Sequence, residues 1–345
     1  MGEMHTVRLE PVGIEFEVDE DDTVLNGAFK QGLMLMHGCK EGQCAACKSF
    51  LLEGEVDLDR YSNFALPDGE LEEGWTLLCK SHAITDLTVE LINYDEEILR
   101  SGVMQRTLTT RVEAIEPLTR DIRRLVLSLT EGEMPFHPGQ YVDIQIPGTD
   151  EYRSFSMANL PSSDGHLEFM IKLYPGGRFS SLLSEGTLQV GDELDVTGPY
   201  GVFTLRNTDR PILFVGGGAG MAPILSLLRS MAEQGIARPA VYYYGAREED
   251  DLFHLEELLE LQGALPGFSF VPALSDADWD GESGLITDVV DRLEADLAGF
   301  DAYLCGPPPM VDAAQEMLIR RGIDEANIHF DKFTTTATTE ENSHT

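Results

Sequence analysis

The sequence predicts a multidomain chain with a small α/β domain around a cysteine loop, an antiparallel β-barrel and a doubly wound α/β domain. Three observations lead to this fold class. Four of the five cysteines fall between positions 39 and 79. Short strand-like runs separated by Gly/Pro turns fill the middle of the chain, and strands alternate with helices in its last third. The length of 345 residues suits two or three domains, and the 42% of apolar residues can form their cores.

The first block, residues 1–95, opens and closes with strands. They are predicted at Thr6–Glu10, Ile14–Val18 and Leu87–Leu91. Thr23 and the two aspartates before it offer N-cap chemistry for a helix that reaches about Gln31. The polar residues 96–105 are interpreted as a linker to the next block.

The second block, 106–208, has the spacing of a small antiparallel barrel. Its strands are predicted at Leu108–Ile115, Leu125–Leu129, Tyr141–Ile146, Leu167–Leu173 and Glu193–Val196. The third block, 209–333, predicts a parallel, doubly wound sheet. Its strands are expected at Ile212–Val215, Ala240–Tyr244, Ser269–Pro272 and Ala302–Cys305, and its helices at Ala222–Gln234, Leu252–Leu261, Ile286–Leu297 and Val311–Arg321. A Thr- and Glu-rich tail, 334–345, is expected to be disordered.

The formal net charge of −37 excludes nucleic acids and anionic membranes as natural partners. The acidic charge is explained either by an acidic surface that keeps the protein soluble or by a basic partner that docks on it. The uncharged window 211–228 contains four glycines and two prolines, which predict a buried strand, turn and helix start instead of a membrane span. No secretory signal is visible at the start, so the chain is expected in the cytoplasm, where cysteines more often serve metals or catalysis than disulfides.

The cysteines have the spacing of a plant-type 2Fe–2S site. Cys39-x4-Cys44-x2-Cys47 forms one loop, and Cys79 follows after a long gap. Two irons need four thiolates, which one tight loop and one distant segment can supply. Three other interpretations compete: a redox-active C-x-x-C, a structural zinc site and buried free thiols. Zinc ribbons usually have two C-x-x-C knuckles, and thioredoxin-like sites lack two further cysteines so placed, so the cluster is favoured.

The barrel block holds two segments with flavin-binding chemistry. In Arg153-Ser-Phe-Ser156, Arg153 can fork onto a phosphate, and Phe155 can lie against an isoalloxazine ring. Gly176-Gly-Arg-Phe-Ser-Ser181 offers glycine backbone and hydroxyl groups at a helix start, which can hold a pyrophosphate. Each signal is weak when taken alone.

The third block holds nucleotide-binding chemistry at two strand ends. Gly216-Gly-Gly-Ala-Gly-Met-Ala-Pro223 joins a hydrophobic strand to a helix, the context that a phosphate-binding loop needs. Cys305-Gly-Pro-Pro-Pro-Met310 ends the last predicted strand, where parallel sheets bind ligands. Acidic residues 248–251 favour NADH over NADPH, whereas Arg247 points weakly the other way.

In this order, the motifs resemble the ferredoxin-NADP reductase superfamily with an N-terminal ferredoxin, over nearly the whole chain. The resemblance implies a β-grasp ferredoxin domain, an FAD-binding barrel and a nicotinamide-binding domain. It implies that Arg153, Phe155 and Ser156 bind FAD, with Phe in place of the usual Tyr and Ser156 near flavin N5. It also implies that Cys305 lies beside the nicotinamide and that Phe330 or Phe333 approaches the flavin. The other residues implied to bind FAD or the nicotinamide are Gly177, Ser180, Gly216, Gly217, Gly218, Gly220, Pro223, Gly306 and Pro307.

The cysteine loop and the residues up to Cys79 are similar to the reductase components of soluble di-iron methane and propane monooxygenases. This resemblance implies a monomeric NADH-dependent reductase with FAD and a 2Fe–2S cluster, whose partner is a di-iron hydroxylase, above all a propane-oxidising one. Reductases of Rieske aromatic-ring dioxygenases or phenol hydroxylases carry the same cofactors and are the alternative. A non-enzymatic iron–sulfur redox sensor is a further rival, which would show no NADH turnover.

Overall fold

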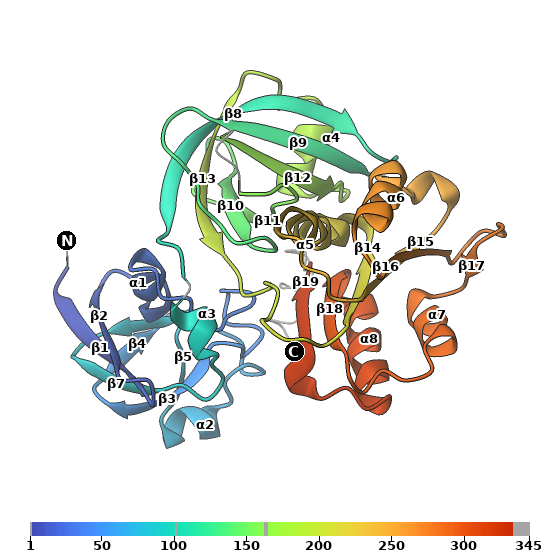
Figure 1. Cartoon of the computed structure of the whole chain (residues 1–345). Helices are drawn as coiled ribbons and strands as arrows, with labels where there is room; N and C mark the ends of the chain where they lie inside the picture. Colours follow the sequence, from blue (N-terminus) through green and yellow to red (C-terminus); the bar gives the residue numbers. More distant parts are fainter. Residues whose placement is uncertain (1, 101, 162–164, 334–345) are drawn as a thin grey trace. The chain divides into compact units, whose positions relative to one another are not determined.

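The computed structural model describes residues 2–100, 102–161 and 165–333. The chain forms two compact units (Figure 1). Among the described residues, one contains the chain up to Arg106 together with Gly198–Val202, and the other contains Thr107–Thr197 and Phe203–Phe333. The tail 334–345, expected to be disordered, lies outside the described residues. Within the described ranges, none of the helices has the length and apolar character needed to cross a membrane.

The first unit is built on a five-stranded sheet in the order β2–β1–β7–β3–β5. Its strands are β1 (Met4–Glu10), β2 (Ile14–Asp19), β3 (Lys48–Glu53), β5 (Trp75–Leu77) and β7 (Leu87–Glu90). β1 and β7 run parallel, whereas the other pairs are antiparallel. β4 (Val56–Leu58) and β6 (Ser81–Ala83) form a separate antiparallel pair. This mixed sheet, with the long cysteine loop between α1 and β3, is the expected ferredoxin domain.

Helix α1 (Val24–Lys30) begins where the capping residues predict. The Thr23 hydroxyl accepts a hydrogen bond from the Asn26 N–H at 3.3 Å, and the apolar face of the helix is buried. Helices α2 (Asp68–Glu73) and α3 (Glu96–Arg100) have no counterpart in the prediction. Both are shorter than two turns, so hydrophobic periodicity cannot reveal them. α3 lies within the stretch 96–105.

The segment Gly198–Val202 packs against the ferredoxin domain. The Tyr200 ring meets Phe29 of α1 edge-on, with ring centroids 5.5 Å apart. The Gly201 N–H donates a hydrogen bond to His37 Nε2 at 3.2 Å. This segment therefore belongs with the ferredoxin domain by contact, although Gly198–Tyr200 also form the end of barrel strand β13 (Glu193–Tyr200).

The second unit begins with the expected barrel. Its strands are β8 (Arg106–Pro117), β9 (Ile122–Leu129), β10 (Tyr141–Gln145), β11 (Tyr152–Ser156), β12 (His166–Lys172) and β13 (Glu193–Tyr200). They follow the order β11–β10–β13–β8–β9–β12, and a bridge between Met157 and Phe169 connects the two ends and nearly closes the barrel. Helix α4 (Arg178–Ser184) starts after Gly177, as predicted.

The rest of the second unit is a parallel sheet in the order β17–β16–β15–β14–β18–β19. Its strands are β14 (Ile212–Gly217), β15 (Ala240–Ala246), β16 (Phe268–Leu274), β17 (Glu282–Ser283), β18 (Asp301–Gly306) and β19 (Ile328–Lys332). Its helices are α5 (Met221–Gln234), α6 (Leu255–Ala264), α7 (Ile286–Leu293) and α8 (Pro308–Arg320), and short 3-10 turns lie at Gly218–Gly220, Glu249–Asp251 and Glu325–Asn327. Helix α7 ends earlier than its predicted limit of Leu297.

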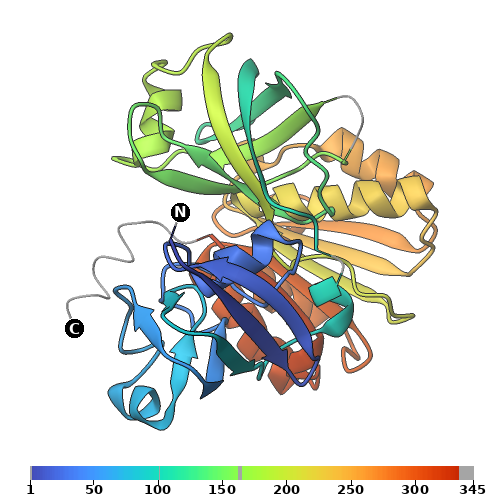
Figure 2. The ribbon, with the colours of Figure 1, turned by 90° about the vertical axis from the view of Figure 1, so that its left-hand side faces the viewer.

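Helices cover both faces of this parallel sheet, as the doubly wound prediction requires (Figures 1 and 2). On one face Phe214, Tyr242 and Tyr303 pack with residues of α5 and α6. On the other face Leu213 and Val215 pack with residues of α7 and α8. Since β14 has β15 on one side and β18 on the other, the strand order reverses between β14 and β18. Parallel sheets bind ligands beyond the carboxyl ends of the strands at such a switch point.

An ion-pair network fastens the barrel to the parallel-sheet domain. Arg229 of α5 contacts Glu168 of β12 at 3.0 Å and Glu257 of α6 at 2.6 Å. Burial alone would raise the pKa of Glu257, but hydrogen bonds and charge from His254 and Arg229 outweigh it and lower this pKa to about 2. The network therefore stays ionised at neutral pH and links the two domains of the second unit through Arg229.

Candidate redox sites

The cysteine loop is wound so that backbone N–H groups face the sulfur atoms. The N–H groups of Glu41 and Gln43 donate to Cys39 Sγ at 3.4 and 3.3 Å, and the Cys39 N–H donates to Cys44 Sγ at 3.3 Å. Gly42 has φ of +69°, which favours glycine in this winding. Amide donors of this kind stabilise thiolates that ligate a metal.

Gly38 is needed for a different reason. Its φ is not positive, but a Cβ at this position would lie 2.9 Å from Cys44 Sγ. Lys40 and Ala45 are unusual among non-glycine residues in having φ of +56°. The loop thus accepts strained backbone in order to direct its amides and sulfurs inward.

The four thiols fall into two pairs, as two irons with two thiolates each require. A hydrogen bond from the Cys44 thiol, aided by backbone N–H groups, lowers the pKa of Cys39 to about 6. A hydrogen bond from the Cys79 thiol lowers the pKa of Cys47. The donor set therefore fits a 2Fe–2S cluster held by all four predicted cysteines.

At the switch point of the parallel sheet, the glycine-rich loop touches the end of β18 through backbone alone. Gly216 pairs with Cys305 across β14 and β18. A Cβ on Gly220 would lie 2.2 Å from the carbonyl oxygen of Cys305, and one on Gly217 would lie 2.9 Å from Met310 Sδ. The loop then turns at Gly218, whose φ is +56°, into α5.

This geometry suits a nucleotide, because backbone can approach a phosphate closely only where side chains are missing. Pro223 is buried in the first turn of α5. Gly306 has φ of +144°, and Pro307 is the residue before α8. The structure thus brings both predicted nicotinamide segments to one edge of the sheet.

Three polar side chains meet where the barrel contacts this edge. The Ser156 hydroxyl, at the end of β11, donates a hydrogen bond to Asp331 Oδ2 at 3.3 Å. Asp331 lies on β19 and is in register with Cys305 on β18. Two of these residues, Ser156 and Cys305, are predicted site residues, whereas Asp331 is absent from the prediction.

Burial sets the protonation of this group. It raises the pKa of Asp331 to about 6, although the hydrogen bond from Ser156 works in the opposite direction. Burial, followed by the nearby charge of Asp331, raises the pKa of the fully buried Cys305 thiol well above its usual value. Cys305 is therefore a neutral thiol at physiological pH and is not poised as a nucleophile.

The predicted flavin-binding arginine lies beside a second arginine. Arg153 Nη2 contacts Glu151 at 3.2 Å, and Arg178, the first residue of α4, pairs with the same carboxylate. Two guanidinium groups gathered at one place match a pyrophosphate, which can replace the carboxylate between them. The residues present therefore fit FAD.

Other predicted flavin-binding residues shape this region. The Phe155 ring is half-buried, with its centroid 4.9 Å from that of Phe179. A Cβ on Gly177 would lie 2.4 Å from Ser180 Oγ, so a side chain there would displace the Ser180 hydroxyl. The Ser180 hydroxyl donates to the carbonyl oxygens of Tyr174 and Gly177, and in this structure it holds the turn together.

The C-terminal strand distinguishes the two candidate phenylalanines. Phe330 is 47% exposed, and Lys332 Nζ lies 4.8 Å from the centroid of its ring. Phe333 is half-buried, and its N–H donates to the Gly306 carbonyl at 3.0 Å. Phe333 is thus attached to the predicted nicotinamide segment, which favours it over Phe330.

Arg247 follows β15 and is held by two carboxylates. It contacts Asp251 at 3.1 Å and Asp121, at the turn before β9, at 3.0 Å. Burial alone would raise the pKa of Asp121, but Lys172 and Arg247 hold it below its usual value. The guanidinium that points weakly to NADPH in the sequence is therefore already paired.

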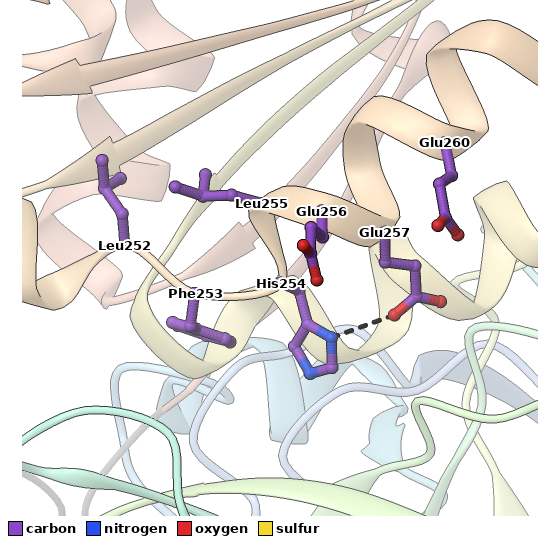
Figure 3. A pocket seen from close by; sticks show the side chains of 7 residues that line it. All are labelled: Leu252, Phe253, His254, Leu255, Glu256, Glu257 and Glu260. Carbon is purple, nitrogen blue, oxygen red and sulfur yellow. Dashed lines mark hydrogen bonds and ion pairs between the residues drawn. The ribbon is translucent and has the colours of Figure 1, made fainter.

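A hollow of about 670 Å³ lies at the start of α6 and shares no residue with these sites (Figure 3). Glu256, Glu257 and Glu260 line it, and Glu257 is bonded to His254. Three carboxylates would repel a nucleotide phosphate. The hollow is therefore a poor candidate for the nucleotide site, and the backbone at the switch point remains the better one.

Comparisons with known proteins agree with this division. Residues 7–83 match the 2Fe-2S iron-sulfur cluster binding domain, 109–205 match the oxidoreductase FAD-binding domain, and 214–316 match the oxidoreductase NAD-binding domain. The chain is 51% identical over 97% of its length to the propane 2-monooxygenase reductase component of Mycolicibacterium goodii, of which it covers 98%. The chain belongs to the family of three-domain oxygenase reductases.

Solved structures of this family show the same fold. The Amycolatopsis cytochrome P450 reductase GcoB has a TM-score of 0.87 and 32% identity, over 96% of this chain and 99% of that one. The ferredoxin reductase in carbazole 1,9a-dioxygenase has a TM-score of 0.76 and 31% identity, with the same coverage of both chains. As an oxygenase reductase, the chain is an oxidoreductase whose cofactors are a 2Fe–2S cluster and FAD and whose nucleotide is NADH. The expected fold class and cofactors are confirmed.

The residue that the sequence missed in this oxygenase reductase is Asp331. It lies in Ile328-His-Phe-Asp-Lys332, an edge strand too short and too polar for a clear strand pattern. The sequence could have indicated Asp331 only through its place two residues before Phe333, because Phe333 is one of the two residues expected to approach the flavin.

Proposed function

We propose that this reductase supplies electrons to the di-iron hydroxylase of a propane-type alkane monooxygenase. One observation carries the proposal: identity to propane 2-monooxygenase reductase components is 51% over nearly the full chain. It is 36% to the phenol 2-monooxygenase reductase component of Pseudomonas and 32% to the toluate 1,2-dioxygenase electron transfer component of Pseudomonas putida. The reductase would act as a monomer in the cytoplasm.

FAD, when bound, would supply the chemistry that links a two-electron donor, NADH, to a one-electron cluster. The chain's own residues would bind and orient the flavin and the nucleotide. Arg153 and Arg178 would hold the flavin pyrophosphate, and the backbone of the Gly216–Gly220 loop would hold the phosphates of NADH. Ser156 and the neutral thiol of Cys305 would position the reacting rings.

Asp331 has an electrostatic role in this proposal. Its carboxylate lies beside Cys305, where the nicotinamide is expected, and NADH gains positive charge as it loses hydride. An ionised Asp331 would stabilise that charge in a site with little water. Ser156 holds the carboxylate in place through its hydrogen bond.

Reconstitution tests the proposed partner. The pure reductase, mixed with the hydroxylase and accessory components of a propane monooxygenase, should support propane-dependent NADH oxidation. Because the chain has net charge −37, this coupled rate should fall by about tenfold or more between 50 and 500 mM salt. Rates independent of salt would contradict electrostatic docking.

Parallel reactions with a phenol hydroxylase and a Rieske dioxygenase test the alternative acceptors. The fold does not separate them, because structures of this shape include a cytochrome P450 reductase and a dioxygenase reductase. Higher turnover with either alternative than with the propane system would overturn the proposed partner, while leaving the NADH, FAD and cluster chemistry intact.

The held Arg247 leads to a prediction on nucleotide choice. Asp121→Asn should free one side of the guanidinium and raise kcat/KM for NADPH relative to NADH by about tenfold, since an arginine can then meet a 2′-phosphate. Steady-state kinetics with ferricyanide measure this ratio. Glu193→Gln is the control, because it removes another barrel carboxylate, paired with Arg111 at 3.1 Å. An unchanged ratio in Asp121→Asn would show that Arg247 does not face the 2′-position.

A further inference from the structure

The most exposed large apolar side chain among the described residues lies beside the cluster loop. Phe64 is 91% exposed, whereas the next such residue, Val190, is 65% exposed. A single exposed apolar residue needs no explanation by itself. Phe64 is distinguished by the rigid segment that carries it and by what that segment contacts.

The segment Tyr61–Leu66 is packed onto the cysteine loop. The Ser62 N–H donates to the Gly42 carbonyl at 3.0 Å, and a Cβ on Gly42 would lie 2.8 Å from Tyr61 Cβ. Gly42 lies between the ligands Cys39 and Cys44. The backbone that carries Phe64 is therefore attached directly to the loop that holds one pair of ligands.

Phe64 is presented on a fixed turn. Its N–H donates to Ser62 Oγ at 3.2 Å, and the N–H groups of Ala65 and Leu66 donate to the Ser62 carbonyl at 2.9 and 3.2 Å. Ala65 and Leu66, the next two residues, are fully buried. The turn thus places a ring in water between anchored neighbours, so little conformational entropy is lost when a partner covers it.

The surroundings define the chemistry of the partner. The first 100 residues contain 22 Asp and Glu but seven Lys and Arg. Two of those lysines flank cluster ligands and are paired internally, Lys48 with Glu70 at 2.7 Å and Lys80 with Glu41 at 3.6 Å. Helix α2, which begins at Asp68, two residues after Leu66, adds the exposed Glu72 and Glu73. A fitting partner has a basic rim around an apolar pocket.

We propose that Phe64 is the anchor through which the reductase docks its cluster loop onto the electron-accepting hydroxylase. The inference rests on the proposed function, since it takes the hydroxylase as acceptor. Electron transfer needs the acceptor close to the cluster, and Cys44 is the ligand that is exposed on this unit. An aromatic side chain that is exposed when free and buried in the complex, with charged residues around it, has the form of an interface hot spot.

The test compares three variants with the propane monooxygenase hydroxylase as the probe. Phe64→Ala should raise the hydroxylase concentration for half-maximal coupled turnover by about tenfold or more, and Phe64→Tyr should restore most of the affinity. Ile92→Ala is the matched control: Ile92 is 54% exposed but follows β7, and its variant should behave as wild type. All three should keep wild-type flavin and cluster spectra and wild-type NADH–ferricyanide and NADH–cytochrome c rates.

The salt dependence separates the anchor from the acidic rim. Phe64→Ala removes no charge, so its coupled rate should fall with salt along the same slope as that of the wild type. Equal coupled turnover of Phe64→Ala and wild type would overturn the inference, and so would a parallel loss of cytochrome c reduction, which would show internal damage. If the wild type itself fails to drive the hydroxylase, the proposed function has failed instead.

Discussion

Cys79→Ala should abolish the cluster and, with it, electron delivery to any protein acceptor. Two irons need four thiolates, and Cys79 is the partner of Cys47 in one of the two thiol pairs. The side chain is 5% exposed, so no outside ligand can replace it easily. We expect cytochrome c and hydroxylase reduction below about 1% of wild type, by analogy with the loss of other metal ligands.

The same variant should still reduce ferricyanide with NADH, because flavin and nucleotide bind in the second unit. Visible spectra should show flavin bands without cluster bands. Cys305→Ala is the control for cluster content, since it removes the cysteine that lies in the other unit. A full cluster signal in Cys79→Ala would show that another residue completes the site.

Asp331→Asn should slow reduction of the flavin by NADH about 100-fold at pH 8, because it removes a fixed negative charge from the proposed hydride-transfer site. The wild-type rate should rise with pH through about 6, where the raised pKa of Asp331 places its ionisation. The variant should lack this rise. Stopped-flow absorbance measures the flavin step directly. The control is Asp312→Asn, which removes the carboxylate 2.6 Å from neighbouring Lys332.

The stability of Asp331→Asn should rise, although its rate of flavin reduction should fall. An aspartate whose folded pKa exceeds its unfolded value of 3.8 destabilises the fold above pH 6, and this cost disappears as pH falls toward 3.8. Asp331→Asn should therefore raise the unfolding temperature at pH 8. If Asp331→Asn is slower but more stable than the wild type, the charge of Asp331 serves function. If the rate of flavin reduction in Asp331→Asn still rises near pH 6, the ionisation belongs to another group.

The sequence predicts best those features that depend on local spacing. The predicted ligands Cys39, Cys44 and Cys47 lie in one loop, and their spacing predicts the 2Fe–2S domain that the family comparison confirms. The glycine-rich loop can be predicted for the same reason, since consecutive residues show that it lies between a buried strand and a helix. The order of strands and helices in the second unit follows from the same kind of periodicity.

Features that depend on contacts between residues far apart in the chain could not be predicted from the sequence. Asp331 gains meaning only because β19 lies beside β18 and sets it in register with Cys305. The partner of Arg247, Asp121, is 126 residues away, so its charge could not be assigned from the acidic run alone. Likewise, the exposure of Phe64 depends on how its turn packs, and a Phe in a mostly apolar run looks like core.

The contact of Gly220 with the carbonyl of Cys305 has a consequence for how such reductases diversify. A Cβ at Gly220 would meet the backbone carbonyl of Cys305, so this position accepts no side chain unless the proposed nucleotide loop moves away from β18. Single substitutions at this contact are therefore not tolerated in the NADH-oxidising part of the protein. A lineage that acquires a new oxygenase would have to alter the surface of the ferredoxin domain instead, where residues such as Phe64 can vary without cost to the interior.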